Sequence, residues 1–159
     1  MVVHGSFTLD VDVEAPLGQV YAAVEQPHLR GRWLRLPGRP EPSGPAADGG
    51  EVLRSSLTIG DALERIERRT HVAELRPEER VVLTYTAVVN DRIRWVSLVT
   101  VEFLAQAPGT HLTWTEQYAF LEMTGDGRDD VAHLRGGTAL QLNGLAVSLG
   151  AEPRAASRS

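Results

Sequence analysis

Residues 51 to 120 form a succession of strand-like segments joined by short turns, and this pattern constrains the fold more than any other feature. The predicted turns are Gly60-Asp61, RPEER at 76–80, Asn90-Asp91 and Ala107-Pro108-Gly109. Short connections of this chemistry join antiparallel neighbours, so the segment predicts a meander of five strands. A strand at 7–13, in which apolar and polar residues alternate, brings the predicted sheet to about six strands.

The meander has one apolar face, and its other face is mostly Thr, Arg, Glu and Ser. The residues predicted on the inner face are Leu53, Leu57, Ile59, Ile66, Val72, Val81, Leu83, Tyr85, Ala87, Trp95, Val99, Val101, Phe103, Leu112, Trp114, Tyr118 and Phe120. An antiparallel sheet with one apolar face must bury that face against another layer.

That layer is predicted to be a helix over residues 131–149, the longest helix-compatible stretch in the chain. Its apolar stripe consists of Val131, Leu134, Thr138, Leu142, Leu145 and Leu149. Asp129 and Asp130 suit the positive end of the helix dipole, and Gly150 suits a left-handed stop. We expect the stripe to pack on the apolar face of the sheet.

Two features of this helix need an explanation. Gly136 and Gly137 each cost roughly 1 kcal/mol relative to alanine in a helix interior. Either the helix begins at Thr138 or another element passes too close for a Cβ, and we favour the close approach. Leu140 and Val147 form a second apolar strip on the opposite side, which needs cover from a loop or from another subunit.

The remaining segments are shorter. Pro16 and an apolar stripe predict a first helix over about 16–25, and HLRGRWL at 28–34 predicts a second short helix or turn. Residues 35–50 carry four prolines and four glycines without apolar periodicity, which predicts a loop that is either a lid or simply disordered. We expect one domain over 1–150 and a disordered tail over 151–159.

Composition excludes several classes of chemistry. The 159 residues contain no cysteine, which removes disulfides and thiolate sites and favours the cytoplasm. All 16 basic residues are arginine, so lysine Schiff bases are excluded. A net charge of −5 argues against unspecific binding to nucleic acid or acidic membranes. No apolar run approaches about 18 residues, so no membrane span is expected.

Motifs for nucleotide, hydrolase or metalloprotease chemistry are absent from the sequence. The histidines are scattered, with His71 and His111 predicted on the outer face of the sheet, so we expect no metal site. Asp10 and Asp12 fall on the polar face of the first strand and are predicted to be solvated. No cofactor is expected.

Polar residues that alternation places on the inner face are the candidate site. Glu116, Arg68, Thr70 and Ser97 share that face, and Arg135 borders the helix stripe. A lone buried carboxylate is strongly disfavoured. Glu116 therefore belongs to an ion pair closing the core, is turned outward by a bulge, or anchors a ligand in a cavity. The candidate ligand-binding residues are Arg68, Tyr85, Trp95, Ser97, Trp114, Glu116, Tyr118, Thr138 and Leu142, and Glu116 is the one candidate catalytic residue.

The chain resembles the SRPBCC (START-like) superfamily, and within it the branch of activators of the heat-shock protein 90 ATPase. The resemblance rests on VEAP and VYAAVEQPHLRGRW (13–33), HVAELRPEERVVLTY (71–85), VTVEF and GTHLTWTEQYAF (99–120) and RGGTALQLNGLAVSL (135–149). It implies an α+β helix-grip fold, in which a curved antiparallel sheet grips the C-terminal helix and two short helices follow the first strand. It also implies a cavity between sheet and helix that often takes an apolar small molecule.

These observations favour a small-molecule-binding protein for an apolar or aromatic ligand. A co-chaperone-like interaction module with a chaperone partner is the first alternative, and a homodimer would be one way to cover the second helix strip. A polyketide cyclase-like enzyme, with Glu116 as acid or base and Arg68 or Tyr85 orienting a carbonyl, is the second alternative. An open cavity of several hundred Å³ would favour the ligand, and a filled core would favour the interaction module.

Overall fold

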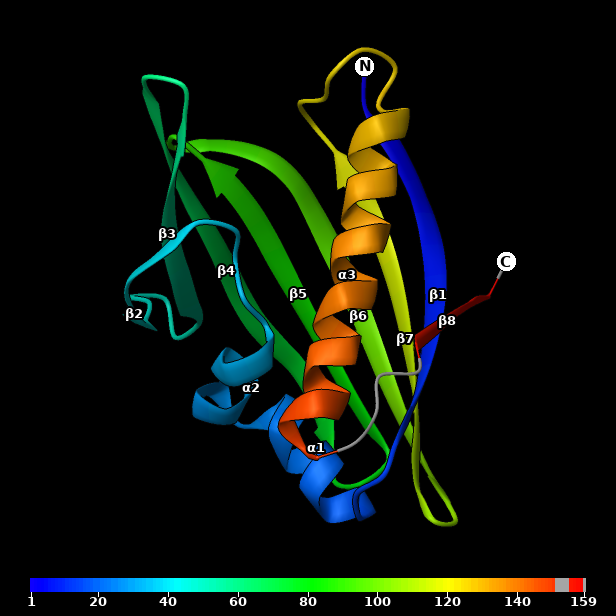
Figure 1. Cartoon of the computed structure of the whole chain (residues 1–159). Helices are drawn as coiled ribbons and strands as arrows, with labels where there is room; N and C mark the ends of the chain where they lie inside the picture. The colour runs from blue at the N-terminus through cyan, green and yellow to red at the C-terminus, as the bar shows by residue number, and fades with distance from the viewer. Residues whose placement is uncertain (151–154, 159) are drawn as a thin grey trace.

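The structure is a computed structural model that describes residues 1–150 and 155–158. Its framework is an antiparallel sheet in the order β2-β3-β4-β5-β6-β7-β1-β8 (Figure 1). The strands are β1 (Val3–Val13), β2 (Arg39–Pro45), β3 (Glu51–Ile59), β4 (Ala62–Arg76), β5 (Arg80–Val89), β6 (Arg92–Gln106), β7 (Gly109–Phe120) and β8 (Ala155–Arg158). Strands β3 to β7 are the predicted meander, which is confirmed.

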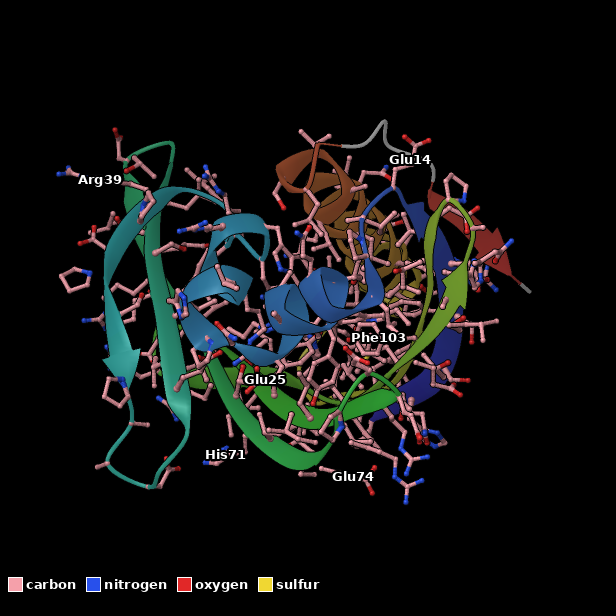
Figure 2. The ribbon with its side chains drawn as sticks, turned by 90° about the horizontal axis from the view of Figure 1, so that it is seen from below. Glu14, Glu25, Arg39, His71, Glu74 and Phe103 are labelled. Carbon is pink, nitrogen blue, oxygen red and sulfur yellow. The ribbon has the colours of Figure 1, made fainter. Side chains whose placement is uncertain are left out.

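Within the described residues, three helices complete the fold: α1 (Leu17–Glu25), α2 (Pro27–Trp33) and α3 (Arg128–Ser148). The sheet curls around α3, with β2 and β3 at one end of the curve and β1 and β8 at the other (Figure 2). This is the predicted helix-grip arrangement. None of the helices in the described part of the chain combines the length and apolarity needed to cross a membrane.

The turns follow from residues that tolerate a left-handed backbone. Asn90 and Asp91, between β5 and β6, have φ of 50° and 65°, the combination that a two-residue hairpin turn requires. Gly60, between β3 and β4, has φ of 61°. Both connections were predicted from these residue types, and they fix the register of the strands that they join.

The core lies between the concave face of the sheet and α3. Fully buried apolar side chains come from both layers and include Leu83, Val99, Leu112, Leu142 and Leu145. Two residues predicted on the inner face are exposed instead.

Ile59 is 56 % exposed because it ends β3, at the hairpin. Val72 is 43 % exposed, and the β4–β5 register shifts between Val72 and Glu74, where a bulge interrupts the alternation on which the prediction relied.

The prediction that residues 35–50 form a loop is wrong for its central part. Residues 39–45 form β2, which pairs with β3 and has an irregular register between Glu41 and Gly44. Proline lacks the N–H that a central strand must donate, so a proline-rich strand is tolerated at the edge of a sheet, where β2 lies.

The predicted disordered tail also needs correction. Residues 155–158 form β8, which pairs with the edge of β1 from Thr8 to Val11. The rest of the predicted tail, 151–154 and 159, lies outside the described residues. The sheet therefore has more strands than the predicted six because one strand is added at each edge.

The explanation favoured for Gly136 and Gly137 in α3, a close approach by another element, is also wrong. The helix begins at Arg128 and continues through Gly136 and Gly137, so it does not start at Thr138. A Cβ built at either glycine would meet no atom within 4 Å, so no element approaches closely there. The second apolar strip remains uncovered, since Leu140 is 73 % exposed and Val147 is 55 % exposed.

A buried ion pair fastens the short helices to the sheet. Arg30 in α2 is 2 % exposed, and its Nη2 lies 2.5 Å from Oε1 of Glu51 in β3. The Nη1 of Arg30 also donates to the carbonyl oxygens of Val24 and Glu25, at the end of α1. One side chain thus joins the end of α1, helix α2 and the beginning of β3.

Candidate functional site

A cavity of ≈ 890 Å³ lies between α3, α2 and strands β3 to β6. Its walls are mainly apolar and include Trp33 from α2, Leu57 from β3, Trp95 from β6 and Leu134 from α3. The uncovered Leu140 and Val147 also line it. The second apolar strip of α3 is therefore one wall of this cavity, and Gly137 lies on the same wall.

Glu116 is fully buried and does not line the cavity, but it is hydrogen-bonded to Tyr85, which does. Its Oε2 accepts hydrogen bonds from the Tyr85 hydroxyl and from Ser97 Oγ, the latter at 2.6 Å. Its Oε1 accepts a hydrogen bond from Trp114 Nε1 at 3.0 Å. Three donors from β5, β6 and β7 thus satisfy one carboxylate in the interior, as a buried charge requires.

Tyr85 separates Glu116 from the cavity. Its hydroxyl donates to Glu116 and accepts from Trp95 Nε1 at 3.1 Å. Burial raises the pKa of Tyr85 well above its ordinary value, and the charge of Glu116 raises it further. The hydroxyl therefore stays protonated and acts as a fixed donor to Glu116.

Arg68 lies over the face of the Tyr85 ring. Its guanidinium carbon is 3.5 Å from the centroid of the Tyr85 ring, a cation–π contact. Arg68 is 6 % exposed and forms part of the cavity wall. Its Nε and Nη2 are buried without a hydrogen-bond partner, as is Thr70 Oγ1. Tyr85 thus contacts two groups in different ways: its ring face contacts Arg68 in the cavity wall, and its hydroxyl donates to the buried Glu116.

The structure divides the predicted ligand-binding residues into groups. Arg68, Tyr85, Trp95 and Thr138 line the cavity. Glu116, Ser97 and Trp114 form the hydrogen-bonded layer behind Tyr85. Leu142 is buried in the core, and the Tyr118 ring packs against Phe7 and Phe120.

Glu116 does face inward, as its position in the strand predicted, but it forms no ion pair with Arg68. Sequence reasoning also missed cavity residues. Trp33 was not among the predicted ligand-binding residues, and Gly137 was explained by a close contact, yet both line the cavity. One sequence signal could have pointed to Gly137. Glycine destabilises a helix interior relative to alanine, so its presence on an inward-facing part of the helix calls for a functional explanation.

A second hollow of ≈ 520 Å³ lies over β1 and strands β5 to β7, where Val96, Leu98 and Gln117 line it. Val96 and Leu98 belong to the polar-facing side of the meander, opposite the core residues Val99 and Val101. Arg68, Tyr85 and Trp95 do not line this hollow. The interior cavity, with its polar groups, is therefore the candidate site.

The outer face of the sheet corrects a further prediction. Asp10 was expected to be solvated, but it is 6 % exposed, and its Oδ1 lies 2.9 Å from both His111 Nε2 and Thr113 Oγ1. The other ring nitrogen, Nδ1, lies 2.7 Å from Asp12 Oδ1. Both ring nitrogens of His111 thus face carboxylates, an arrangement that suits the doubly protonated imidazolium. His111 connects β7 to β1.

This geometry predicts a pH-dependent stability. The hydrogen bond to Asp12, followed by that to Asp10, raises the pKa of His111 above its ordinary 6.5. A raised folded-state pKa gives stability that is complete below pH 6.5 and is lost as pH rises through the folded value. We expect the melting temperature of the protein to exceed that of His111→Gln at pH 6 and this difference to shrink by pH 9. An exposed control, His28→Gln, should show no such trend, and a difference independent of pH would contradict the assignment.

Within the described residues, no group of three or more His, Asp and Glu side chains could hold a metal ion.

Comparisons with known proteins agree with this architecture. The family model described as "Activator of Hsp90 ATPase homolog 1-like protein" matches residues 14–150. A comparison with curated proteins gives no match. A solved structure of an uncharacterised protein from Rhizobium leguminosarum is similar, with a TM-score of 0.75, 24% identity and coverage of 94% of this chain and 96% of that one.

The protein Mll3558 from Rhizobium loti is also similar, with a TM-score of 0.73, 26% identity and coverage of 94% of this chain and 99% of that one. DynU16, a protein of the dynemicin biosynthetic locus, shares the fold at a TM-score of 0.58 and 19% identity. The match covers 93% of this chain and 48% of DynU16.

Proposed function

Because the chain belongs to the family of proteins like activator of Hsp90 ATPase homolog 1, within the SRPBCC superfamily, we propose that it uses the helix-grip fold to bind a small molecule. The ligand is apolar or aromatic and lies between α3 and strands β3 to β6. The observation that carries this proposal is the cavity of ≈ 890 Å³. Its volume falls within the roughly 300–1,000 Å³ of small-molecule sites, and the surface of its walls is mainly apolar, as in such sites.

The cavity also favours ligand binding over the two alternative functions. A co-chaperone-like module that works through its outer surface needs no interior space, and a filled core would have supported it. An enzyme that used Glu116 as general acid or base would need that carboxylate within hydrogen-bond reach of the substrate. Glu116 is fully buried, does not line the cavity and is engaged by Tyr85, Ser97 and Trp114. The arrangement therefore favours binding over acid–base catalysis by Glu116.

Gly137 offers a test of the binding site. A Cβ at this position would meet no atom within 4 Å, and Gly137 lines the cavity. Gly137→Leu should therefore fill part of the cavity without strain and stabilise α3 by up to about 1 kcal/mol, because glycine is a poor helix former. We expect this variant to lose ligand binding while its melting temperature rises.

Gly136→Leu is the matched control, since Gly136 is exposed, has equal space around it and does not line the cavity. A panel of flavonoids, fatty acids, sterols and polyketide-like aromatics would be screened by melting temperature and tryptophan fluorescence, because Trp33 and Trp95 line the cavity. A ligand at a hundred times its Kd should stabilise the protein by about 2.7 kcal/mol. Absence of any ligand, or equal binding by both glycine variants, would overturn the proposal.

A further inference from the structure

Arg68, in the cavity wall, carries buried N–H groups that have no hydrogen-bond acceptor. Arg68 is only 6 % exposed, yet two of its guanidinium nitrogens, Nε and Nη2, have no hydrogen-bond acceptor. An arginine in a protein does not lose its proton, so the charge cannot be relieved by deprotonation. A buried donor left without a partner destabilises the folded protein, and the effect is larger for a charged group.

No carboxylate in the described part of the chain pairs with Arg68. Both oxygens of Glu116 are occupied by Tyr85, Ser97 and Trp114. Glu67 pairs with Arg54 and Arg69, and Asp130 lies 3.5 Å from Arg94. Glu64 lines the same cavity but lies four residues away along β4, roughly 13 Å at the rise of a strand.

The two unpaired nitrogens form one edge of the guanidinium. Nε and Nη2 carry parallel N–H groups, the fork that binds both oxygens of a carboxylate at once. We propose that the cavity selects apolar carboxylic acids and that Arg68 binds their carboxylate, an inference that rests on the proposed small-molecule function. The apolar part of the ligand then lies along Trp95, Leu134 and Leu140, which line the cavity with Arg68.

Other head groups fit less well. A neutral carbonyl presents one oxygen to two parallel donors, whereas a carboxylate presents two. A phosphate dianion brings two negative charges to the Arg68 guanidinium, which carries one positive charge, and the excess charge is penalised beside walls that are mainly apolar. Because Nε and Nη2 are now shielded from solvent, binding requires a rotation of the side chain that turns this edge toward the cavity. The adjacent cavity provides the space for that rotation.

The experiment compares two probes that differ only in the head group: dansyl-labelled undecanoic acid and its methyl ester. Fluorescence titration of the full chain gives the Kd of each. We expect the acid to bind roughly ten- to a hundredfold more tightly than the ester, the range given by hydrogen bonds to a charged group. Displacement of the acid probe by oleic acid but not by oleyl alcohol should confirm the preference with unlabelled ligands.

Substitution of Arg68 assigns the preference to this residue. In Arg68→Met, which keeps an apolar chain without the charge, the acid should lose its advantage while the ester keeps its Kd. Arg69→Met is the matched control, because Arg69 is the next residue of β4, is exposed and does not line the cavity. Arg68→Lys keeps the charge without the fork and should retain only part of the preference, which provides a second variant if Arg68→Met folds poorly.

The outcomes separate this inference from the function on which it rests. If acid and ester bind equally well to the unsubstituted protein, the carboxylate inference is wrong and the small-molecule function stands. If neither probe binds and the panel also yields no ligand, the proposed function itself fails. If both Arg68 variants still bind the acid more tightly than the ester by the same factor, another group binds the carboxylate and the assignment to Arg68 is wrong.

Discussion

Replacing Glu116 with alanine is expected to lower the free energy of unfolding by about 3–5 kcal/mol, the range for removing one member of a buried charged network. The substitution leaves the Tyr85 hydroxyl, Ser97 Oγ and Trp114 Nε1 without their acceptor in the buried interior. It also removes the carboxylate hydrogen-bonded to the hydroxyl of Tyr85, whose ring contacts Arg68. Urea denaturation at pH 7 would measure the loss.

Two companion variants sharpen this prediction. Glu116→Gln keeps the side-chain volume, so its destabilisation reports the hydrogen bonds and charge without a new cavity. Glu102→Ala removes an exposed carboxylate from β6 and should change the free energy of unfolding by less than about 0.5 kcal/mol. A Glu116→Ala protein as stable as Glu102→Ala would show that the inner carboxylate does not hold the three strands together.

Replacing Glu51 with alanine should lower the free energy of unfolding by about 2–3 kcal/mol, at or below the lower end of the range for breaking a buried ion pair. The substitution leaves Arg30 Nε and Nη2 without their acceptor, while its Nη1 keeps the two backbone carbonyls. The side chain of Glu51 is 18 % exposed, so water can partly replace it. Thermal and urea unfolding both measure the effect.

The same substitution should also affect the cavity, because the Arg30–Glu51 pair fixes α2, which contributes Trp33 to the cavity wall. We expect ligand affinity to fall along with stability. Glu41→Ala, on the exposed edge strand β2, is the control, since it removes only an exposed hydrogen bond to Ser56. Equal effects of Glu41→Ala and Glu51→Ala on melting temperature would contradict this role of the ion pair.

The strands and helices that could be predicted from the sequence have strong local signals. The β5–β6 hairpin was predictable because Asn90 and Asp91 tolerate positive φ and the flanking residues alternate. Strand β2 had no such signal, since prolines remove both the alternation and the donors, and only pairing with β3 makes it a strand. The bulge after Val72 was hidden for a related reason: a one-residue irregularity leaves little trace in composition.

The candidate site shows what strand alternation can and cannot predict. Alternation placed Glu116 on the inner face correctly because successive side chains point to opposite sides of a strand. It could not predict which groups Glu116 would contact: an ion pair was one of the expected arrangements, whereas its partners are the neutral donors of Tyr85, Ser97 and Trp114. The place of Gly137 in the cavity wall could not be predicted either, because an open space beside a helix depends on the positions of all the other elements.

The proline-rich edge of the sheet has a consequence for how copies of this protein can associate. An exposed edge strand is a template on which another chain can extend the sheet, and such growth leads to aggregates. Pro40, Pro42 and Pro45 deprive β2 of three N–H donors, and the irregular register between Glu41 and Gly44 breaks the straight ladder that an incoming strand would need. Strand addition at this edge is thereby discouraged, so self-association through β2 must use side-chain surfaces.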